Sequence, residues 1–379
     1  MRLTNIEYSE FPNDPSSWHL SATALGQVSL IVGKNSAGKT RLLSVIGTLA
    51  KLITGAIPQL FKSAHYIAEF EDGVDTYIYE IQMNESLVIK ECLARNGSSL
   101  MQRGPGGMGT IHSEKQKETL EFQSPASVVA AYVKRDEIQH PFLEVLYKWG
   151  DDLRHYTFGT SFGREHLFQV TDFYNDKLPP NDPRMRLLVM VYKQAFIEFQ
   201  NAFDIAIMAD MKLLGYNLED VGVEAIPLIV PGLPSLMGMF CKEADLQTKT
   251  NQLTMSAGMF RALALVVYIN DCIFRKLKRT ILIDDIGEGL DYSRSQAFVD
   301  LLIERAAANS FQLIMTTNDR FVMNGVSLDH WGVMTRVGSD VRVVNKQNSP
   351  EVFSRFDELG LNNFDFFSSG FFENGLSAP

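Results

Sequence analysis

The chain has 379 residues, of which 45% are hydrophobic and 21% charged, so a disordered or fibrous protein is excluded. Its 35 basic and 45 acidic residues give a net charge of −10, which argues against a surface built for non-specific DNA binding. Three scattered cysteines without a CxxC pair indicate reduced thiols. Without a leader-like start or an apolar run of the roughly 20 residues that a membrane crossing needs, we expect a cytoplasmic protein with no direct membrane insertion.

The first part of the chain is predicted to form strands around one helix. Residues 1–32 contain short strands, and the last is an apolar run that ends at Gly33. Apolar residues recur at helical spacing over 41–53, so a helix follows the loop directly. Residues 64–95 alternate around turn residues, which predicts a small antiparallel sheet. The glycine-rich stretch 102–110 is predicted to be a flexible loop, because it follows no strand and opens no helix.

The remaining chain changes character twice. From about 124 to 225 broad apolar helical faces predict a packed helical insertion, and residues 226–250 are predicted to be a connection with one strand at most. From residue 252 helices and apolar strands alternate, which indicates a parallel sheet. We therefore predict an α/β fold of the P-loop NTPase type, with a mixed sheet, an antiparallel β subdomain and a helical insertion. The predicted domain boundaries are 1–123, 124–250 and 251–379.

The segment GKNSAGKT fits the phosphate-loop pattern GxxxxGK[ST] without a mismatch, between an apolar strand and an amphipathic helix. Curled backbone amides and a helix N-terminus form a concave anion site that suits a polyphosphate. Lys39 would reach the β and γ oxygens, and the Thr40 hydroxyl would ligate Mg²⁺. The sequence thus predicts ATP and Mg²⁺ as cofactors, with ATP bound by Gly33, Lys34, Asn35, Ser36, Ala37, Gly38, Lys39 and Thr40.

Acidic residues follow the buried strand predicted at 280–283. Carboxylates at the carboxyl end of a parallel strand face the ligand crevice of an α/β sheet. Asp284 is therefore the expected second Mg²⁺ partner, through a water molecule. Either Asp285 or Glu288 would orient or deprotonate the attacking water.

With these motifs, the chain resembles ABC-type ATPases of the RecF, SMC and OLD-like branch, also called AAA-family ATPases in bacteria. The segments GKNSAGKT, LTMSAGMFRALAL, ILIDD and IMTTND resemble the Walker A, signature, Walker B and switch motifs, in the family's order. The likeness covers residues 1–95 and 250–335. It implies a homodimer that encloses ATP, in which Ser256 and Gly258 contact the γ-phosphate held by a second subunit.

The resemblance also assigns roles to residues that differ from the family pattern. Asp285 stands where the family has glutamate, and its side chain is one methylene shorter, so hydrolysis is expected to be slow or to use Glu288. Asn318 stands at the position of the switch histidine; it can hydrogen-bond a phosphate or water but cannot carry the proton. Asp291 falls at the D-loop position, where the family contacts the opposing subunit.

Members of this branch serve in DNA repair and phage defence. The resemblance therefore implies a nucleotide-gated dimeric clamp with an effector partner, a nuclease or a toxin, and with DNA as a further candidate partner. The energising subunit of a membrane transporter would share the ATP site, but the long insertion, the MSAGM segment and Asn318 argue against it. A sensor of a toxin-type effector with little hydrolysis is another alternative. A self-sufficient OLD-type nuclease would need more chain after the ATPase.

Two aromatic features have both a structural and a functional interpretation. Trp18 precedes the phosphate-loop strand and is either a buried aromatic, which we favour, or a platform for adenine. Five phenylalanines lie between residues 364 and 372, and they would be unfavourable in water. We favour completion of the core over the docking of a partner.

Overall fold

The computed structural model describes residues 1–57, 59–159, 162–174, 179, 182–226 and 235–374. The chain forms two compact units that interleave along the sequence. Unit 1 comprises Met1–His155, Lys278–Asp284 and Ser310–Pro379, and unit 2 comprises Tyr156–Leu277 and Asp285–Asn309. The sequence-based boundary at 123 falls inside unit 1, and the boundary at 250 falls inside unit 2.

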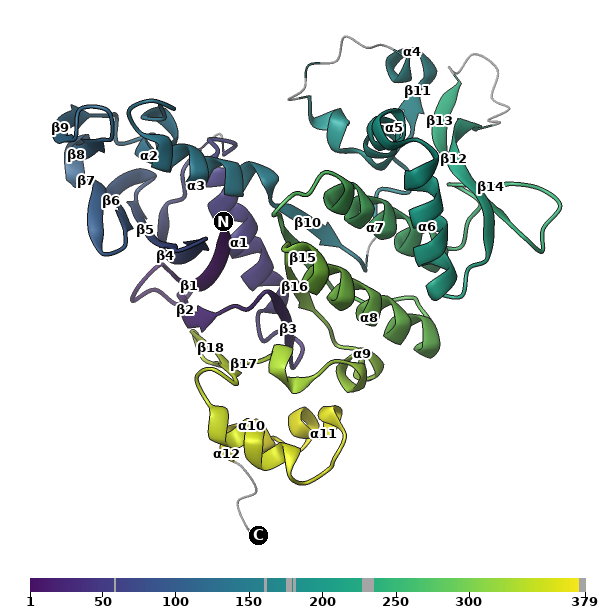
Figure 1. Cartoon of the computed structure of the whole chain (residues 1–379). Helices are drawn as coiled ribbons and strands as arrows, with labels where there is room; N and C mark the ends of the chain where they lie inside the picture. The colour runs from purple at the N-terminus through teal and green to yellow at the C-terminus, as the bar shows by residue number, and fades with distance from the viewer. Residues whose placement is uncertain (58, 160–161, 175–178, 180–181, 227–234, 375–379) are drawn as a thin grey trace. The chain divides into compact units, whose positions relative to one another are not determined.

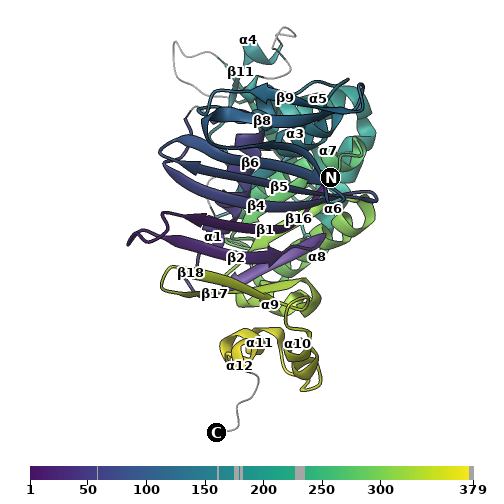
Figure 2. The ribbon, with the colours of Figure 1, turned by 90° about the vertical axis from the view of Figure 1, so that its left-hand side faces the viewer.

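Unit 1 is built on a mixed sheet of 14 strands in the order β10-β15-β16-β3-β17-β18-β2-β1-β4-β5-β6-β7-β8-β9. The strands, many of which lie side by side in Figure 2, are β1 (Arg2–Glu10), β2 (Trp18–Ala24), β3 (Val28–Gly33), β4 (Ser63–Asp72), β5 (Asp75–Asn84), β6 (Leu87–Arg95), β7 (Ser98–Arg103), β8 (Met108–Ser113), β9 (Glu118–Gln123), β10 (Arg154–Thr157), β15 (Thr280–Asp284), β16 (Gln312–Thr316), β17 (Trp331–Val337) and β18 (Asp340–Asn345).

The core of this sheet is parallel. β15 pairs with β16, β16 with β3, and β3 with β17, all in parallel. Every residue of β3, β15 and β16 is buried, as expected for apolar strands covered on both faces. The parallel sheet predicted from the alternation of strands and helices is confirmed. Because the strands run the same way, their carboxyl ends meet at one edge of the sheet.

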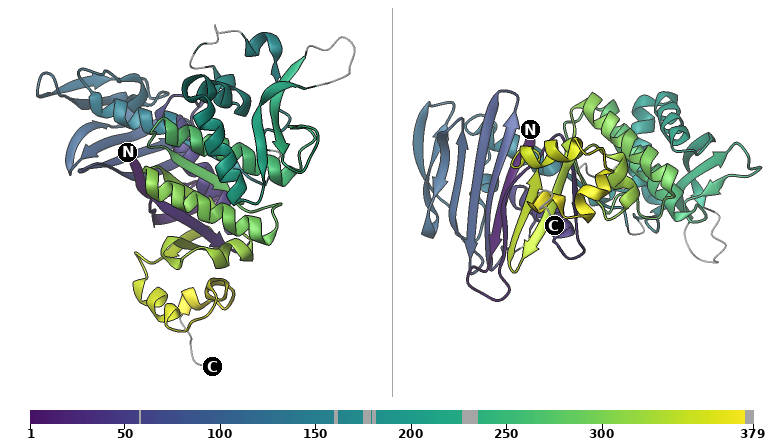
Figure 3. Two further views of the ribbon diagram at one scale, coloured as in Figure 1. Left: turned by 45° about the vertical axis from the view of Figure 1, so that its right-hand side comes forward. Right: turned by 90° about the horizontal axis from the view of Figure 1, so that it is seen from below.

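The strands from β4 to β9 form the antiparallel part, which is blue in Figure 3. The hairpins predicted over 64–95 are confirmed. The flexible loop predicted over 102–110 is wrong, because Arg103 and Gly109 pair across a β7–β8 hairpin that turns through the short 3₁₀ helix Pro105–Gly107. Gly107 has φ +83°, a backbone conformation that glycine adopts without steric cost, and it therefore allows the tight turn of this hairpin.

The helices of unit 1 are α1 (Lys39–Ile53), α2 (Ala130–Val133), α3 (Pro141–Asp152), α9 (Arg320–Gly325), α10 (Pro350–Asp357), α11 (Asn363–Ser368) and α12 (Phe371–Asn374), with a 3₁₀ turn at Leu328–His330. α1 packs against β3, β15, β16 and α3 (Figure 1). Trp149 of α3 donates a hydrogen bond from Nε1 to the Thr280 hydroxyl at 3.0 Å. This contact fixes α3 to the strand that carries Asp284.

The phenylalanine-rich tail packs its rings against α10 and against Trp331 of β17. Phe353, Phe356 and Phe366 are buried, and the ring of Phe366 lies 4.6 Å from that of Phe353 and 5.0 Å from that of Phe356. Phe371 is buried as well. Of the five phenylalanines between residues 364 and 372, Phe366, Phe371 and Phe372 are buried, and the favoured interpretation, completion of the core, is confirmed for these three.

Unit 2 combines a small sheet with a group of helices. Its strands are β11 (Phe168–Gln169), β12 (Leu218–Ile226), β13 (Leu236–Glu243) and β14 (Thr250–Asn251). Its helices are α4 (Val170–Phe173), α5 (Leu188–Phe199), α6 (Asn201–Leu213), α7 (Ala257–Phe274) and α8 (Tyr292–Asn309), with a 3₁₀ turn at Pro183–Arg186. α7 packs against α5, α6 and α8.

The helix predicted up to residue 225 is wrong at its end. β12 occupies Leu218–Ile226 and pairs antiparallel with β13, because the helical pattern stops at Gly215, whose φ is +79°. Gly222 allows the close approach of Phe240, whose ring carbon would lie 2.8 Å from an added Cβ. Residues 227–234 of the predicted connection lie outside the described residues.

A buried polar contact joins three helices of unit 2. Asp210 on α6 accepts hydrogen bonds from Asn270 on α7 at 2.8 Å and from Arg305 on α8 at 2.6 Å. Among the described helices, α7 alone is long and apolar enough to cross a membrane, and 67% of it is buried inside the fold. That burial is typical of a core helix.

Candidate functional site

The phosphate loop joins β3 to α1 in a conformation that only small residues permit. A Cβ on Gly33 would lie 2.6 Å from the Met334 carbonyl oxygen, and Gly38, the N-cap of α1, has φ +115°. Ser36 also lies in the left-handed region, at φ +65°. No side chain caps α1, so the first amides of the helix are available to a bound anion.

Lys39 carries a buried positive charge in this loop. Its side chain is 5% exposed, and Nζ donates to the Gly33 carbonyl at 2.7 Å and to the Lys34 carbonyl at 3.3 Å. A buried ammonium requires acceptors, and these carbonyls satisfy it beside the loop. The loop therefore combines a fixed cation with amide donors, a donor set that fits a polyphosphate.

Asp284 and Thr40, the predicted Mg²⁺ partners, lie in contact. Asp284 ends β15 and is 3% exposed; its Oδ1 accepts hydrogen bonds from the Thr316 hydroxyl at 2.5 Å and the Thr40 hydroxyl at 3.2 Å. Hydroxyl and carboxylate oxygens are the ligands that Mg²⁺ prefers, so these two residues fit the ion.

Thr316, which orients the Asp284 carboxylate, was missed by the sequence analysis. It ends β16, and its side chain is completely buried. The parallel register aligns Ile283 with Met315, so the residues that follow them meet at the same sheet edge. The signal for Thr316 was its place at the end of an apolar strand next to the Walker B strand.

Asn318 lies two residues beyond Thr316, exposed at the turn before α9. Around it, the Thr317 hydroxyl accepts a hydrogen bond from the Asp319 amide at 3.0 Å, and the Asp319 carboxylate caps α9 by accepting from the Phe321 amide at 2.7 Å. These two hydrogen bonds hold the backbone of the turn in place, and Asn318 is exposed at the surface of unit 1.

Ser256 and Gly258 lie at the start of α7 in unit 2. Ser256 is the N-cap, and its hydroxyl accepts a hydrogen bond from the Met259 amide at 3.2 Å while the side chain stays exposed. A Cβ on Gly258 would lie 2.8 Å from the Gly289 carbonyl oxygen. The helix start and the turn after β15 therefore pack closely, and both interpretations of Ser256, as cap and as phosphate contact, remain compatible with its position.

The two candidate water-activating acids also belong to unit 2. Asp285 has φ +54°, in the left-handed region that is unfavourable for most residues and is often found at functional sites. The Glu288 carboxylate lies against Gly159, where an added Cβ would collide with it, and Asp285 Cβ is 3.7 Å from that same point. Arg261 donates to the Glu288 carbonyl at 2.8 Å. Both acids thus converge on one glycine, which leaves no room for a side chain.

Asp291 caps α8 in the structure. Its carboxylate accepts hydrogen bonds from the Arg294 amide at 3.0 Å, the Ser293 hydroxyl at 2.9 Å and the Arg294 guanidinium at 2.8 Å. These contacts, with the Arg294 amide foremost, hold the pKa of Asp291 below its ordinary value. Asp291 is exposed, and its predicted contact with a second subunit stays a prediction.

Trp18 is a buried aromatic rather than an open platform. Its side chain is fully buried, and the Arg41 guanidinium lies 4.4 Å from its ring centroid. Arg41 is itself ion-paired with Glu10. One face of the indole is therefore covered by a fixed cation, and the favoured interpretation is confirmed.

A phosphate loop after a buried parallel strand, with an aspartate and a threonine at the ends of the next strands, defines an α/β P-loop fold. No family model matches the sequence, and no curated protein matches it. Solved structures do match by fold. A structure of the Smc head bound to the C-winged helix domain of ScpA aligns with a TM-score of 0.56 and 15% identity, covering 91% of this chain and 97% of that one.

A second Smc head domain, with an extended coiled coil and bound to the C-terminal domain of ScpA, derives from Pyrococcus furiosus. It aligns with a TM-score of 0.51 and 13% identity, covering 94% of this chain and 99% of that one. The chain therefore has the fold of SMC head domains. The predicted α/β fold of the ABC-ATPase type, with its mixed sheet, is confirmed.

Proposed function

We propose that this protein is an ABC-type ATPase that binds ATP with Mg²⁺ at residues 33–40 and hydrolyses it. The observation that carries the proposal is the contact of Thr40 with Asp284 beside the phosphate loop. A hydroxyl at a helix start and a buried carboxylate from a neighbouring strand end form the pair of oxygens expected at a Mg²⁺–nucleotide site.

Each residue of unit 1 then has a distinct role. The loop amides and Lys39 would bind the β and γ oxygens, with Lys39 leaving its carbonyl partners for the phosphates. Thr40 and Asp284 would hold Mg²⁺. The ion would neutralise negative charge on the β- and γ-phosphates. Thr316 positions Asp284, and Asn318 would hydrogen-bond the γ-phosphate or the water.

Asp285 is the proposed group that orients the attacking water, and Glu288 is the alternative residue for this role. Aspartate is shorter than glutamate, and a displacement of about 1 Å at a reacting group can reduce a rate by about 100-fold. We therefore propose slow turnover. This feature also favours a second candidate function, a sensor that uses ATP binding to control a toxin-type effector and hydrolyses little.

The active form is proposed to be a homodimer closed by ATP. Ser256 is exposed and Gly258 is half-buried at the N-terminus of an 18-residue helix, and the positive end of a helix favours an anion. In a dimer they would contact the γ-phosphate held by the second copy. Asp291, exposed on the same unit, would contact that copy as well.

A protein partner is proposed by analogy with the two Smc heads, which were solved with domains of ScpA. We propose that this chain acts in the cytoplasm in a DNA-related process such as phage defence or DNA repair. Its partner would be an effector of the nuclease or toxin type, and DNA would be the trigger or substrate of the complex.

The test measures ATP binding, turnover and molar mass for the wild type and for Asp285→Asn and Glu288→Gln, with and without DNA. Asparagine tolerates a left-handed backbone, so Asp285→Asn should fold normally. We expect it to bind ATP, to turn over at least tenfold more slowly and to accumulate as a dimer.

Normal turnover by Asp285→Asn, together with loss of turnover in Glu288→Gln, would show that Glu288 rather than Asp285 orients the attacking water. Monomers in both variants at saturating ATP would contradict the clamp. Tight ATP binding with negligible wild-type turnover would favour the sensor, and failure of the wild type to bind ATP would contradict the whole proposal.

A further inference from the structure

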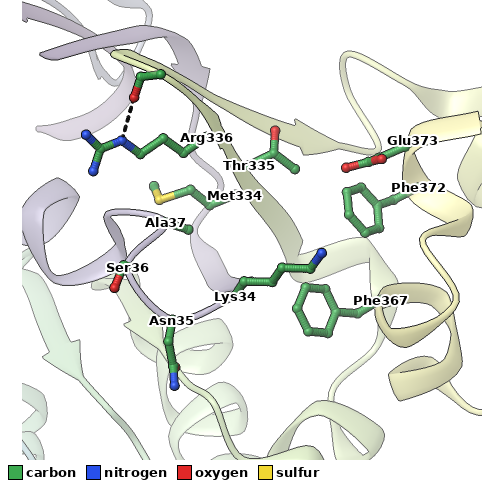
Figure 4. A pocket seen from close by; sticks show the side chains of 11 residues that line it. Lys34, Asn35, Ser36, Ala37, Met334, Thr335, Arg336, Phe367, Phe372 and Glu373 are labelled. Carbon is green, nitrogen blue, oxygen red and sulfur yellow. Dashed lines mark hydrogen bonds between the residues drawn. The ribbon is translucent and has the colours of Figure 1, made fainter.

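A pocket of about 350 Å³ lies beside the phosphate loop in unit 1 (Figure 4). Its walls come from the loop, from the end of β17 with the following turn, and from the last two helices. The lining residues are Lys34, Asn35, Ser36, Ala37, Met334, Thr335, Arg336, Gly338, Phe367, Phe372 and Glu373. This volume is within the range of small-molecule sites.

One wall of the pocket is aromatic. The rings of Phe367 and Phe372 are nearly parallel, 16° apart in plane with centroids 6.1 Å apart, and both border the pocket in Figure 4. The two rings stack on each other and Phe372 is largely buried, so together they form a rigid apolar aromatic wall of the pocket. Such a wall suits a planar aromatic ligand that packs against it.

This wall is held in place by the rest of unit 1. Asn363 at the start of α11 donates to the Val326 carbonyl at 2.8 Å, and the Phe364 amide donates to the Asn324 side chain at 2.8 Å. The ring of Phe366 packs 6.4 Å from that of Trp331, the first residue of β17. These contacts fix α11 to the end of α9 and to the start of β17.

Two cationic side chains line the pocket, Lys34 from the loop and Arg336 from β17. The Lys34 side chain extends toward the two phenyl rings in Figure 4, and Arg336, whose Nε donates to the Gly338 carbonyl at 2.8 Å, lies on the other side. Glu373 is the acidic member of the lining. An apolar aromatic wall with two cations beside it matches a ligand that has an aromatic ring and negative charge, as a nucleotide has.

Four of the lining residues, Lys34 to Ala37, belong to the phosphate loop itself. A ligand in the pocket therefore touches the segment that would bind the phosphates. The other aromatic candidate for a base, Trp18, is fully buried and has Arg41 over its ring. We infer that the pocket takes the base of the nucleotide held by residues 33–40, stacked on Phe367 and Phe372. The inference rests on the proposed ATP binding.

The test compares ATP with inorganic tripolyphosphate, which has the phosphates and no base, by titration calorimetry on the full chain. The variants are Phe367→Leu, Phe372→Leu and the double variant, with Phe364→Leu as the matched control on the same helix. Leucine keeps apolar volume and removes the ring. Loss of base stacking should raise the Kd for ATP about tenfold in the double variant, while the Kd for tripolyphosphate and all values for Phe364→Leu stay within about twofold.

Equal weakening of ATP and tripolyphosphate, or unchanged ATP binding in the double variant, would overturn the inference. Photolabelling with 8-azido-ATP gives an independent readout, with label expected on residues 363–373. Label on the β1–β2 hairpin instead would also overturn it. These outcomes leave the proposed ATPase intact, whereas a wild type that binds neither ligand would contradict the proposed function itself.

Discussion

The phosphate loop of unit 1 and the signature segment of unit 2 differ in how their functional groups are satisfied. Lys39 and Asp284 are buried and bonded to neighbouring loop and strand residues. Ser256 is exposed, and its hydroxyl caps its own helix by accepting from the Met259 amide. The groups of the first region are held in place by their neighbours, whereas the Ser256 hydroxyl lies at the surface of unit 2. That difference is why we propose that a second copy completes the site.

The largest expected effect is at Lys39, which supplies the fixed cation of the loop. Lys39→Ala should weaken ATP binding and turnover by at least 100-fold, because no other buried cation lies in the described loop. Isothermal titration and a phosphate-release assay would measure it. Lys51→Ala, at an exposed position of the same helix, is the control and should change neither value by more than about twofold. Normal turnover in Lys39→Ala would show that ATP hydrolysis does not depend on the phosphate loop.

The next effect separates the two interpretations of Ser256. Asparagine and aspartate both replace serine as N-caps at little change in stability, but aspartate would place a negative charge against the γ-phosphate. Ser256→Asp should therefore abolish ATP-dependent dimers and reduce turnover by tens of fold, with ATP binding to the monomer nearly unchanged. Light scattering with the Ser256→Asn control checks this. Stable dimers of Ser256→Asp with ATP would mean that Ser256 is a helix cap alone.

A smaller effect is expected at Thr316, within the preorganised region. Thr316→Val keeps the shape and removes the hydroxyl that donates to Asp284 at 2.5 Å. Loss of a hydrogen bond to a charged group is worth about 1.5–3 kcal/mol, so the Mg²⁺ concentration for half-maximal turnover should rise about tenfold. Thr316→Ser should restore the wild-type value. Unchanged Mg²⁺ dependence in Thr316→Val would show that Asp284 needs no positioning.

The smallest effect concerns the Asp291 cap in unit 2. Its pKa is held below the ordinary 3.8, chiefly by the Arg294 amide, so the charged form stabilises the fold at neutral pH and this contribution is lost as pH falls through the folded-state pKa. Asp291→Asn keeps a cap without the charge. The difference in urea midpoint between wild type and variant should shrink as pH falls below about 4. A difference that is independent of pH would mean that the charge contributes nothing.

Local patterns predicted much of the fold correctly. The strand before Gly33, the helix after it and the hairpins over 64–95 appear where the sequence analysis placed them, because each is decided by apolar periodicity and turn residues. The errors came where pairing with distant residues decides the conformation. β12 was predicted as helix, and its strand form depends on pairing with β13.

By itself the sequence determined the phosphate loop, because its glycines and Lys39 act through the local backbone, and it determined the strand and the helix on either side of that loop. Only the tertiary structure brought Thr40, Asp284 and Thr316 into contact, since residues 244 and 32 positions apart in the chain meet through parallel register. It alone placed Phe367 and Phe372 beside the loop. Hydrogen bonds and ring contacts between distant segments depend on how strands pair and helices pack, and no local pattern encodes them.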